Sequence, residues 1–135
     1  VQKEALQDRV EFIGHVDNIQ KTISTFDVIA FPSHFDAPGR PIFEAAFYQV
    51  PSVSCISAPM HDTVQPGETG LVVPEKSPVL LADAIEFFHT NRQEVIRMGS
   101  CAYTLAWKNF DPVLNADKIL RIYTDVLTER ITDGV

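Results

Sequence analysis

Two short apolar runs, each as long as a β-strand and each followed by a loop and a helical pattern, most constrain the fold of this chain. They occupy residues 27–31 and 51–56. Pro32 ends the first run, because proline cannot donate a hydrogen bond to a continuing ladder. Uninterrupted apolar runs are typical of strands that are covered on both faces of a sheet. Strands that alternate with helices predict a doubly wound parallel sheet, which is an α/β fold.

The rest of the chain supplies further elements in the same alternation. We expect a helix end at 1–9, a strand at 10–13, helices at 17–26 and 41–48, a strand at 71–73, a helix capped by Ser77, and helices at 93–108 and 113–127. Apolar residues at helical spacing indicate these helices. The fold is therefore Rossmann-like with a helical C-terminal third. Because ligands of such folds bind at the carboxyl ends of the strands, loops 32–40 and 57–70 are the candidate site.

Composition narrows the class of protein. A chain of 135 residues with 45% apolar residues suits one domain, and its net charge of −7 disfavours nucleic acid and anionic membranes as partners. No apolar run approaches the roughly 20 residues of a membrane-spanning helix, and the start lacks a signal peptide, so we expect a cytoplasmic protein. The two cysteines and four histidines show no metal-ligand spacing, so no metal is expected. We expect Trp107 and Phe110 to be packing residues.

Two acids flank the start of the helix that follows the first apolar run. Asp36 lies in the loop and Glu44 lies in the helix, separated by seven residues. Gly39 would let a ligand approach the backbone, and free N–H groups at a helix that begins near Pro41 suit a phosphate. The guanidinium of Arg40 could reach phosphate, Asp36 or water. Taken alone, the two acids are better interpreted as a partner of the helix dipole, for Glu44, and as a solvated loop residue, for Asp36.

The window from Pro32 to Ala46 resembles the nucleotide-sugar signature of retaining glycosyltransferases of family 4, which have the GT-B fold. That signature has Pro-Ser at a strand end and then two acids separated by seven residues, with a glycine between them. The matching positions here are Pro32, Ser33, Asp36, Gly39, Pro41, Glu44 and Ala45. Residues 10–16 resemble the family's strand that ends in a glycine and a valine, and residues 66–73 resemble its Gly-x-x-Gly turn and short strand.

The resemblance implies a role for each matched residue. Glu44 would hold the ribose hydroxyls of a nucleoside-diphosphate sugar, and Asp36 would contact hydroxyls of the transferred sugar. Backbone N–H groups near Gly39 and Arg40 would face the diphosphate or the sugar, and Val16 would line the base pocket. The implied substrate-binding set is Val16, Asp36, Gly39, Arg40, Pro41 and Glu44, with Asp36 and Glu44 as the catalytic acids. Apart from the donor substrate no cofactor is implied, because positioning and stabilisation of the leaving diphosphate suffice.

The resemblance also implies that residues 1–135 form most of one donor-binding domain. The domain's first two strands and the whole N-terminal acceptor domain would lie outside the chain, so we expect it to be inactive by itself. We expect the absent segment to be supplied by another chain or by strand exchange between copies, or else the strands at 10–13 and 27–31 to pair directly. A nucleotide-sugar epimerase and a non-catalytic α/β binding or regulatory module remain alternatives. Association with a membrane through the absent domain also stays open.

Overall fold

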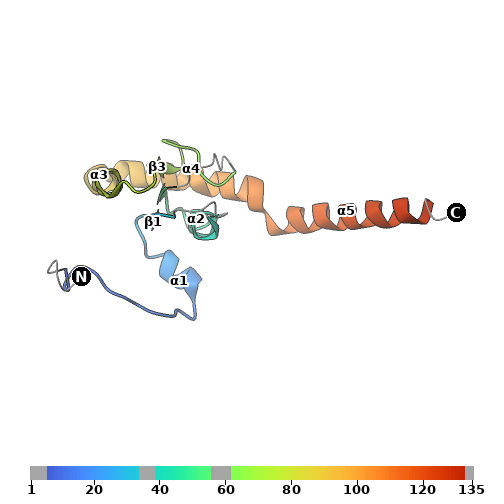
Figure 1. The fold of residues 1–135 in the computed structure, drawn as a ribbon, viewed down its shortest axis with the longest axis horizontal. Coiled ribbons are helices and arrows are strands. Elements are labelled where there is room, and N and C mark those ends of the chain that lie inside the picture. Colours follow the sequence, from blue (N-terminus) through green and yellow to red (C-terminus); the bar gives the residue numbers. More distant parts are fainter. Residues whose placement is uncertain (1–5, 34–38, 56–61, 133–135) are drawn as a thin grey trace.

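A three-stranded parallel sheet forms the centre of the computed structural model, which describes residues 6–33, 39–55 and 62–132 (Figure 1). The strands are β1 (Ile29–Phe31), β2 (Ser52–Ser54) and β3 (Gly70–Val72), in the spatial order β1-β2-β3. Both neighbouring pairs are parallel. These three strands confirm the predicted parallel α/β architecture.

Five helices accompany the sheet in the described residues. They are α1 (Ile19–Ile23), α2 (Arg40–Ala46), α3 (Pro78–Thr90), α4 (Arg92–Phe110) and α5 (Pro112–Thr132). Each lies where apolar spacing predicts a helix, with small differences at its ends. Ser77 occupies the N-cap position of α3, but its side chain makes no capping hydrogen bond there. Ser77 is therefore the N-cap residue, as predicted, but without the side-chain hydrogen bond that a serine cap usually makes.

The N-terminal segment differs from its prediction. Residues 7–9 form a turn in which the amides of Arg9 and Val10 donate to the carbonyl oxygen of Leu6, and residues 10–13 form no strand. Phe12 is 83% exposed. A strand needs a neighbouring strand for its backbone N–H and C=O groups, and none lies beside residues 10–13 within the described part. The predicted strand and its direct pairing with 27–31 are wrong, whereas supply by another chain and strand exchange stay predictions.

The sheet is covered unevenly. β2 is buried along its whole length, as its apolar run predicts. β1 is only partly buried, and Ala30 at its centre is exposed. In the described structure β1 pairs with β2 on one edge alone. The prediction that residues 27–31 are covered on both faces is therefore wrong for β1.

The largest core cluster lies between β2 and the helices α3 and α4. Val53 of β2 is fully buried there and Phe88 of α3 is 1% exposed. The other buried members of this cluster are Ala84, Val95 and Met98. A second cluster holds α2 against α1 through Ala45 and Ile23. Apolar burial therefore fixes α2, α3 and α4 around the sheet, which is the frame on which the loops stand.

Helix α5 extends away from the sheet and the other helices (Figure 1). The Asp111 carboxylate caps it by accepting hydrogen bonds from the amides of Val113 and Leu114, at 2.8 and 3.0 Å. Its exposed large apolar side chains are Val113, Leu114, Ile119, Leu120, Ile122, Tyr123, Val126 and Leu127. No helix in the described residues combines the length and apolarity needed to cross a bilayer.

Candidate functional site

Gly39 and Pro41 set the path of the chain into α2. Gly39 is the N-cap residue, with φ 60° and ψ 38°, in the left-handed region that glycine adopts without steric cost. Its carbonyl oxygen accepts a hydrogen bond from the amide of Ile42 at 2.8 Å, and Gly39 itself is buried. Pro41 in the first turn fixes a helical φ. The predicted helix start after the loop is confirmed, one residue earlier than expected.

Glu44 lies in the second turn of α2, because the helix begins at Arg40. One of its carboxylate oxygens, Oε1, lies 3.0 Å from Nη2 of Arg40, and the two side chains are 34% and 77% exposed. Glu44 is not one of the three partners that the sequence suggested for Arg40. A helix dipole acts mainly within the first turn. The position of Glu44 in the second turn therefore does not favour its interpretation as a dipole partner.

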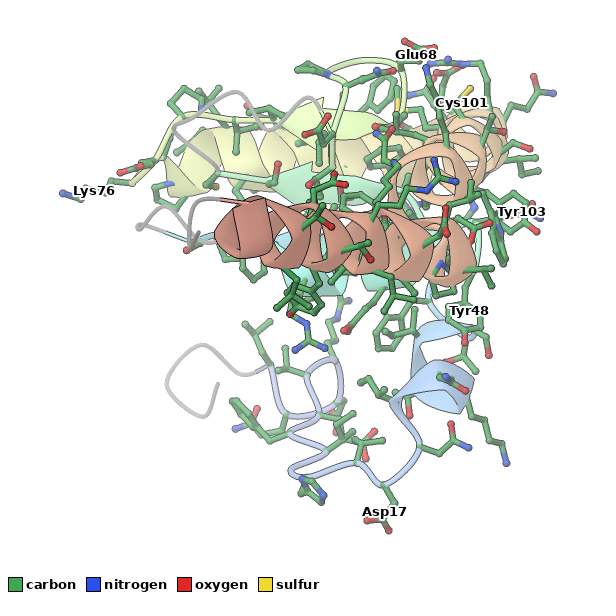
Figure 2. All side chains as sticks on the ribbon, turned by 90° about the vertical axis from the view of Figure 1, so that its right-hand side faces the viewer. Asp17, Tyr48, Glu68, Lys76, Cys101 and Tyr103 are labelled. Atoms are coloured by element: carbon green, nitrogen blue, oxygen red, sulfur yellow. The ribbon has the colours of Figure 1, made fainter. Side chains whose placement is uncertain are left out.

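Glu44 also borders a groove of about 480 Å³ between α1, α2 and the junction of α4 with α5. Its lining residues are Ile19, Gln20, Ile23, Glu44, Phe47, Tyr48, Trp107, Phe110 and Pro112. Figure 2 shows Tyr48 beside α1 at this groove. The lining is largely apolar and aromatic, and Glu44 is its acidic residue. Such a surface suits a flat or apolar group that carries hydroxyls.

Val16 itself is not among the residues that line this groove, but the helix that follows it is. It is half-buried and lies three residues before Ile19, the first residue of α1. The side chain of Asn18 caps α1 by accepting from the amide of Lys21 at 2.9 Å. The start of α1 then lines the groove together with Glu44. The structure thus brings Glu44 and the helix after Val16 to one groove.

Asp36 lies outside the described residues, as do His34 and His61. The predicted meeting of Asp36 with Glu44 at one strand end therefore stays a prediction. The described part contains no group of three or more His, Cys, Asp or Glu side chains that could hold a metal ion. Burial, with Glu75 nearby, raises the pKa of the Cys55 thiol at the end of β2.

The aromatic wall of the groove combines packing with exposure. Phe110 stacks on Phe43 of α2 with ring centroids 4.6 Å apart, and Trp107 meets Phe47 edge-on at 5.2 Å. These contacts confirm the prediction that Trp107 and Phe110 pack. We did not predict that Trp107 and Phe110 also line a groove with Glu44. The sequence signal for it was their spacing of three residues, which places both on one face of a helix.

The chain between β2 and β3, which includes loop 57–70, leads from the carboxyl end of β2 to the amino end of β3. In a parallel sheet all strands point the same way, so the carboxyl end of β2 and the amino end of β3 lie at opposite ends of the strands. The turn at 66–70 therefore lies at the amino edge, where the amide of Gly67 donates to the carbonyl oxygen of Gly70 at 2.8 Å. Only the early part of the loop can reach the carboxyl edge. The expectation that loop 57–70 lies at the carboxyl ends of the strands is therefore wrong for this turn.

Arg97 of α4 holds that turn. Its guanidinium donates to the carbonyl oxygen of Gly67 at 2.9 Å and to Oε2 of Glu94 through two N–H groups. Figure 2 shows Glu68 and Cys101 at this end of the molecule. The hydrogen bond from Arg97 lowers the pKa of the Glu94 carboxyl. The turn is thus fixed by a charge-assisted contact.

Known proteins match both the sequence and the fold. A family model described as glycosyl transferases group 1 matches residues 1–91. The chain is 30% identical over 109 residues to a D-inositol 3-phosphate glycosyltransferase of Corynebacterium efficiens, an alignment that covers 81% of this chain and 26% of that protein. The chain therefore spans about a quarter of the length of this relative.

Solved structures of other proteins share the fold of this chain. The Anabaena protein HepE, solved in complex with UDP and with UDP-glucose, is 25% identical with a TM-score of 0.86, covering 92% of this chain and 34% of HepE. A sucrose-phosphate synthase from Thermosynechococcus elongatus is 25% identical with a TM-score of 0.89, covering 96% of this chain and 33% of the synthase. The parallel α/β domain is thus of the GT-B type. The chain belongs to the group 1 glycosyltransferases.

Proposed function

We propose that this chain binds the nucleoside-diphosphate sugar of a retaining glycosyltransferase, in the groove beside Glu44. One observation carries the proposal: Glu44 lines a groove that the start of α1 also lines. This groove lies in a domain of the fold found in HepE, which was solved with UDP and with UDP-glucose. The base would lie near Val16 and the start of α1, and the ribose hydroxyls would bind Glu44.

The energetics favour exchange of the Arg40 contact for a donor. An exposed pair spaced i, i+4 stabilises a helix by only about 0.3–0.5 kcal/mol. Hydrogen bonds from two ribose hydroxyls to a carboxylate contribute about 1.5–3 kcal/mol each. Glu44 can therefore leave Arg40 for the ribose without a large cost in stability.

The remaining roles concern the diphosphate and the sugar. The left-handed Gly39 would admit a ligand close to the backbone, and N–H groups at Gly39 and Arg40 would face the diphosphate or the sugar. Pro41 would hold these groups in place by fixing the first turn. Asp36 would accept hydroxyls of the transferred sugar. Asp36 and Glu44 would thus act by orienting the donor for departure of its diphosphate.

Sugar transfer itself is proposed for the full-length protein. The relative from Corynebacterium is about four times as long as its match to this chain, and the acceptor is proposed to bind in the part that this chain does not match. We propose that transfer proceeds with retention of the anomeric configuration and without a metal. The donor would be the only small molecule that this site requires.

Calorimetry on the full-length protein tests the proposal. UDP, GDP and ADP are titrated separately, and the matching nucleoside monophosphates serve as controls for the diphosphate contribution. Binding of at least one nucleoside diphosphate more tightly than its monophosphate is expected. Transfer that continues in EDTA, with an anomeric proton coupling that matches the donor's, is expected for a retaining metal-independent enzyme. Absence of binding for all three diphosphates would overturn the donor site.

A further inference from the structure

The end of α4 contacts one loop of the candidate site and the helix that follows the other, through two consecutive residues, Asn109 and Phe110. The side-chain Nδ2 of Asn109 donates to the carbonyl oxygen of Asp62 at 3.1 Å. These residues are 47 positions apart in sequence. Asp62 is the first described residue of the chain that returns from the carboxyl end of β2. The hydrogen bond therefore fixes this chain at the start of its path toward β3.

Phe110 makes the second contact. Its ring stacks on that of Phe43 with an interplanar angle of 17°, and both side chains are half-buried. Phe43 immediately precedes Glu44 in α2. The stacked pair therefore holds the helical turn that carries the proposed ribose-binding acid.

Helix α4 provides a rigid base for these two contacts. Its buried residues are Val95, Met98, Gly99, Ala102, Leu105 and Ala106, which pack over most of its length. Arg97, twelve residues before Asn109, holds the carbonyl oxygen of Gly67. Twelve residues of helix span about 18 Å. The segment from Asp62 to Gly67 is thus held at both of its ends by one helix.

The first turn of α5 is fixed to the same residue. Nδ2 of Asn115 donates to the backbone carbonyl oxygen of Asn109 at 3.3 Å. The side chain of Asn109 thus faces Asp62 while its carbonyl faces α5. An asparagine suits this place because its amide supplies an N–H donor for a carbonyl oxygen, which aspartate, acceptor-only when ionised, does not have.

We propose that Asn109 and Phe110 are positioning residues that hold the segment at Asp62 and the helix carrying Glu44 at one fixed spacing for the donor. This inference rests on the proposed function, because Phe110 lines the donor groove and Asn109, the preceding residue of α4, holds the segment at Asp62. Neither residue touches the reacting atoms in this account. Their effect is on donor binding rather than on the chemical step, since they fix α2 and the segment at Asp62 before the donor enters.

The test compares Asn109→Ala and the isosteric Asn109→Asp with Lys108→Ala, an exposed neighbour on the same helix. Hydrogen exchange is measured on the full-length protein without donor. In both Asn109 variants, exchange should be faster than in the wild type at residues 62–65 and the same as in the wild type at residues 78–90. Lys108→Ala should match the wild type at both segments. The donor KM should rise by about 2- to 10-fold, the factor expected for one hydrogen bond, with kcat and the acceptor KM nearly unchanged. Asn109→Gln, which keeps the amide donor, should recover part of the loss.

The outcomes separate the two proposals. If the wild type binds UDP or another nucleoside diphosphate but the Asn109 variants keep wild-type exchange at 62–65 and wild-type KM, the positioning role is wrong. A fall in kcat without a rise in KM would also overturn it. If the wild type binds no nucleoside diphosphate, the proposed function fails, whereas the exchange data still report whether Asn109 holds Asp62. Should Asn109→Ala unfold, Asn109→Asp and Asn109→Gln decide, and equal exchange in these two would count against the role.

Discussion

The α-carbon of Gly99 in α4 faces the backbone carbonyl of Gln49 so closely that a Cβ at Gly99 would lie 2.0 Å from the carbonyl oxygen. Gln49 lies in the turn after α2 and has a φ of 59°. This approach of two backbones joins α4 to the end of α2. It requires a residue without a side chain at position 99.

Gly99→Ala should therefore destabilise the protein. In an exposed helix the same change stabilises by about 1 kcal/mol, but here the added methyl group must displace backbone, and overpacking of this kind costs about 1–3 kcal/mol. Chemical denaturation of the variant measures the change in the free energy of unfolding. The control is Ser100→Ala, the exposed neighbour on the same helix. A variant as stable as wild type would show that α2 and α4 do not approach as described.

Glu44→Ala in the full-length protein should weaken donor binding by at least the contribution of one hydroxyl–carboxylate hydrogen bond, about 1.5–3 kcal/mol, which is a rise in Kd of roughly 10- to 150-fold or more. The side chain is partly exposed, so folding should be nearly unchanged. Calorimetric titration with the nucleoside diphosphate that binds the wild type measures the effect.

Two controls accompany Glu44→Ala. Glu86→Ala removes an exposed carboxylate from α3, away from the groove, and should leave the Kd unchanged. Arg40→Ala removes the ion pair but keeps the Glu44 carboxylate and the N–H of residue 40, so the Kd should change by less than the effect of Glu44→Ala. Equal Kd values for wild type and Glu44→Ala would refute the ribose-binding role.

Asp36→Asn should change the choice of sugar more than the affinity for the nucleotide. Asparagine keeps the shape of the side chain but lacks the negative acceptor for sugar hydroxyls. The measurement compares Kd values for the free nucleoside diphosphate and for two of its sugars in wild type and variant. If free diphosphate binding fell as much as sugar-nucleotide binding, the division of roles between Asp36 and Glu44 would be wrong.

The Glu94 contact with Arg97 should make stability depend on pH in the acid range. Because the hydrogen bond from Arg97 lowers the folded-state pKa of Glu94, this pair stabilises the protein above the ordinary glutamate pKa of about 4.3. The stabilisation is lost as the pH falls from there through the lowered pKa. Unfolding of wild type and Glu94→Gln should differ at pH 7 and converge as the pH approaches 3. A difference that stays constant with pH would contradict this account.

The two cysteines should react at different rates. Cys55 is 4% exposed and burial raises its thiol pKa, whereas Cys101 is only half-buried. Because the thiolate is the reactive form, iodoacetamide should modify Cys101 first in the folded protein and both cysteines after denaturation. Mass spectrometry of peptides at successive times gives the two rates. Faster labelling of Cys55 would mean that the end of β2 is open to solvent.

Helices were predictable because their signal is local. The apolar spacing in α3 and α4 already marks the face that packs against Val53. The same reasoning failed at residues 10–13, where alternation suggests a strand but no neighbouring strand lies there in the described structure. A strand depends on partners distant in sequence, so local alternation at Phe12 was insufficient.

The candidate site was predictable in its residues but not in its shape. The seven-residue spacing and the family resemblance pointed to Glu44, and Gly39 was expected at the helix start. The pair with Arg40 depends on a helix that begins one residue earlier than predicted, which places both members of the i, i+4 pair in the helix. The groove joins α1, α2 and α4, and its aromatic wall includes Trp107 from 63 positions beyond Glu44. Such tertiary proximity has no local signature in the sequence.

Hydrogen exchange of the full-length protein with and without UDP tests the central claim most directly, because it shows where a donor nucleotide binds. The account predicts slower exchange in the presence of UDP at residues 14–20 and 39–45, with residues 92–105 of α4 unchanged. If a different nucleoside diphosphate binds the wild type in calorimetry, that nucleotide replaces UDP. Saturating nucleotide that leaves both predicted segments unchanged, or that protects only α4, would contradict a donor site beside Glu44.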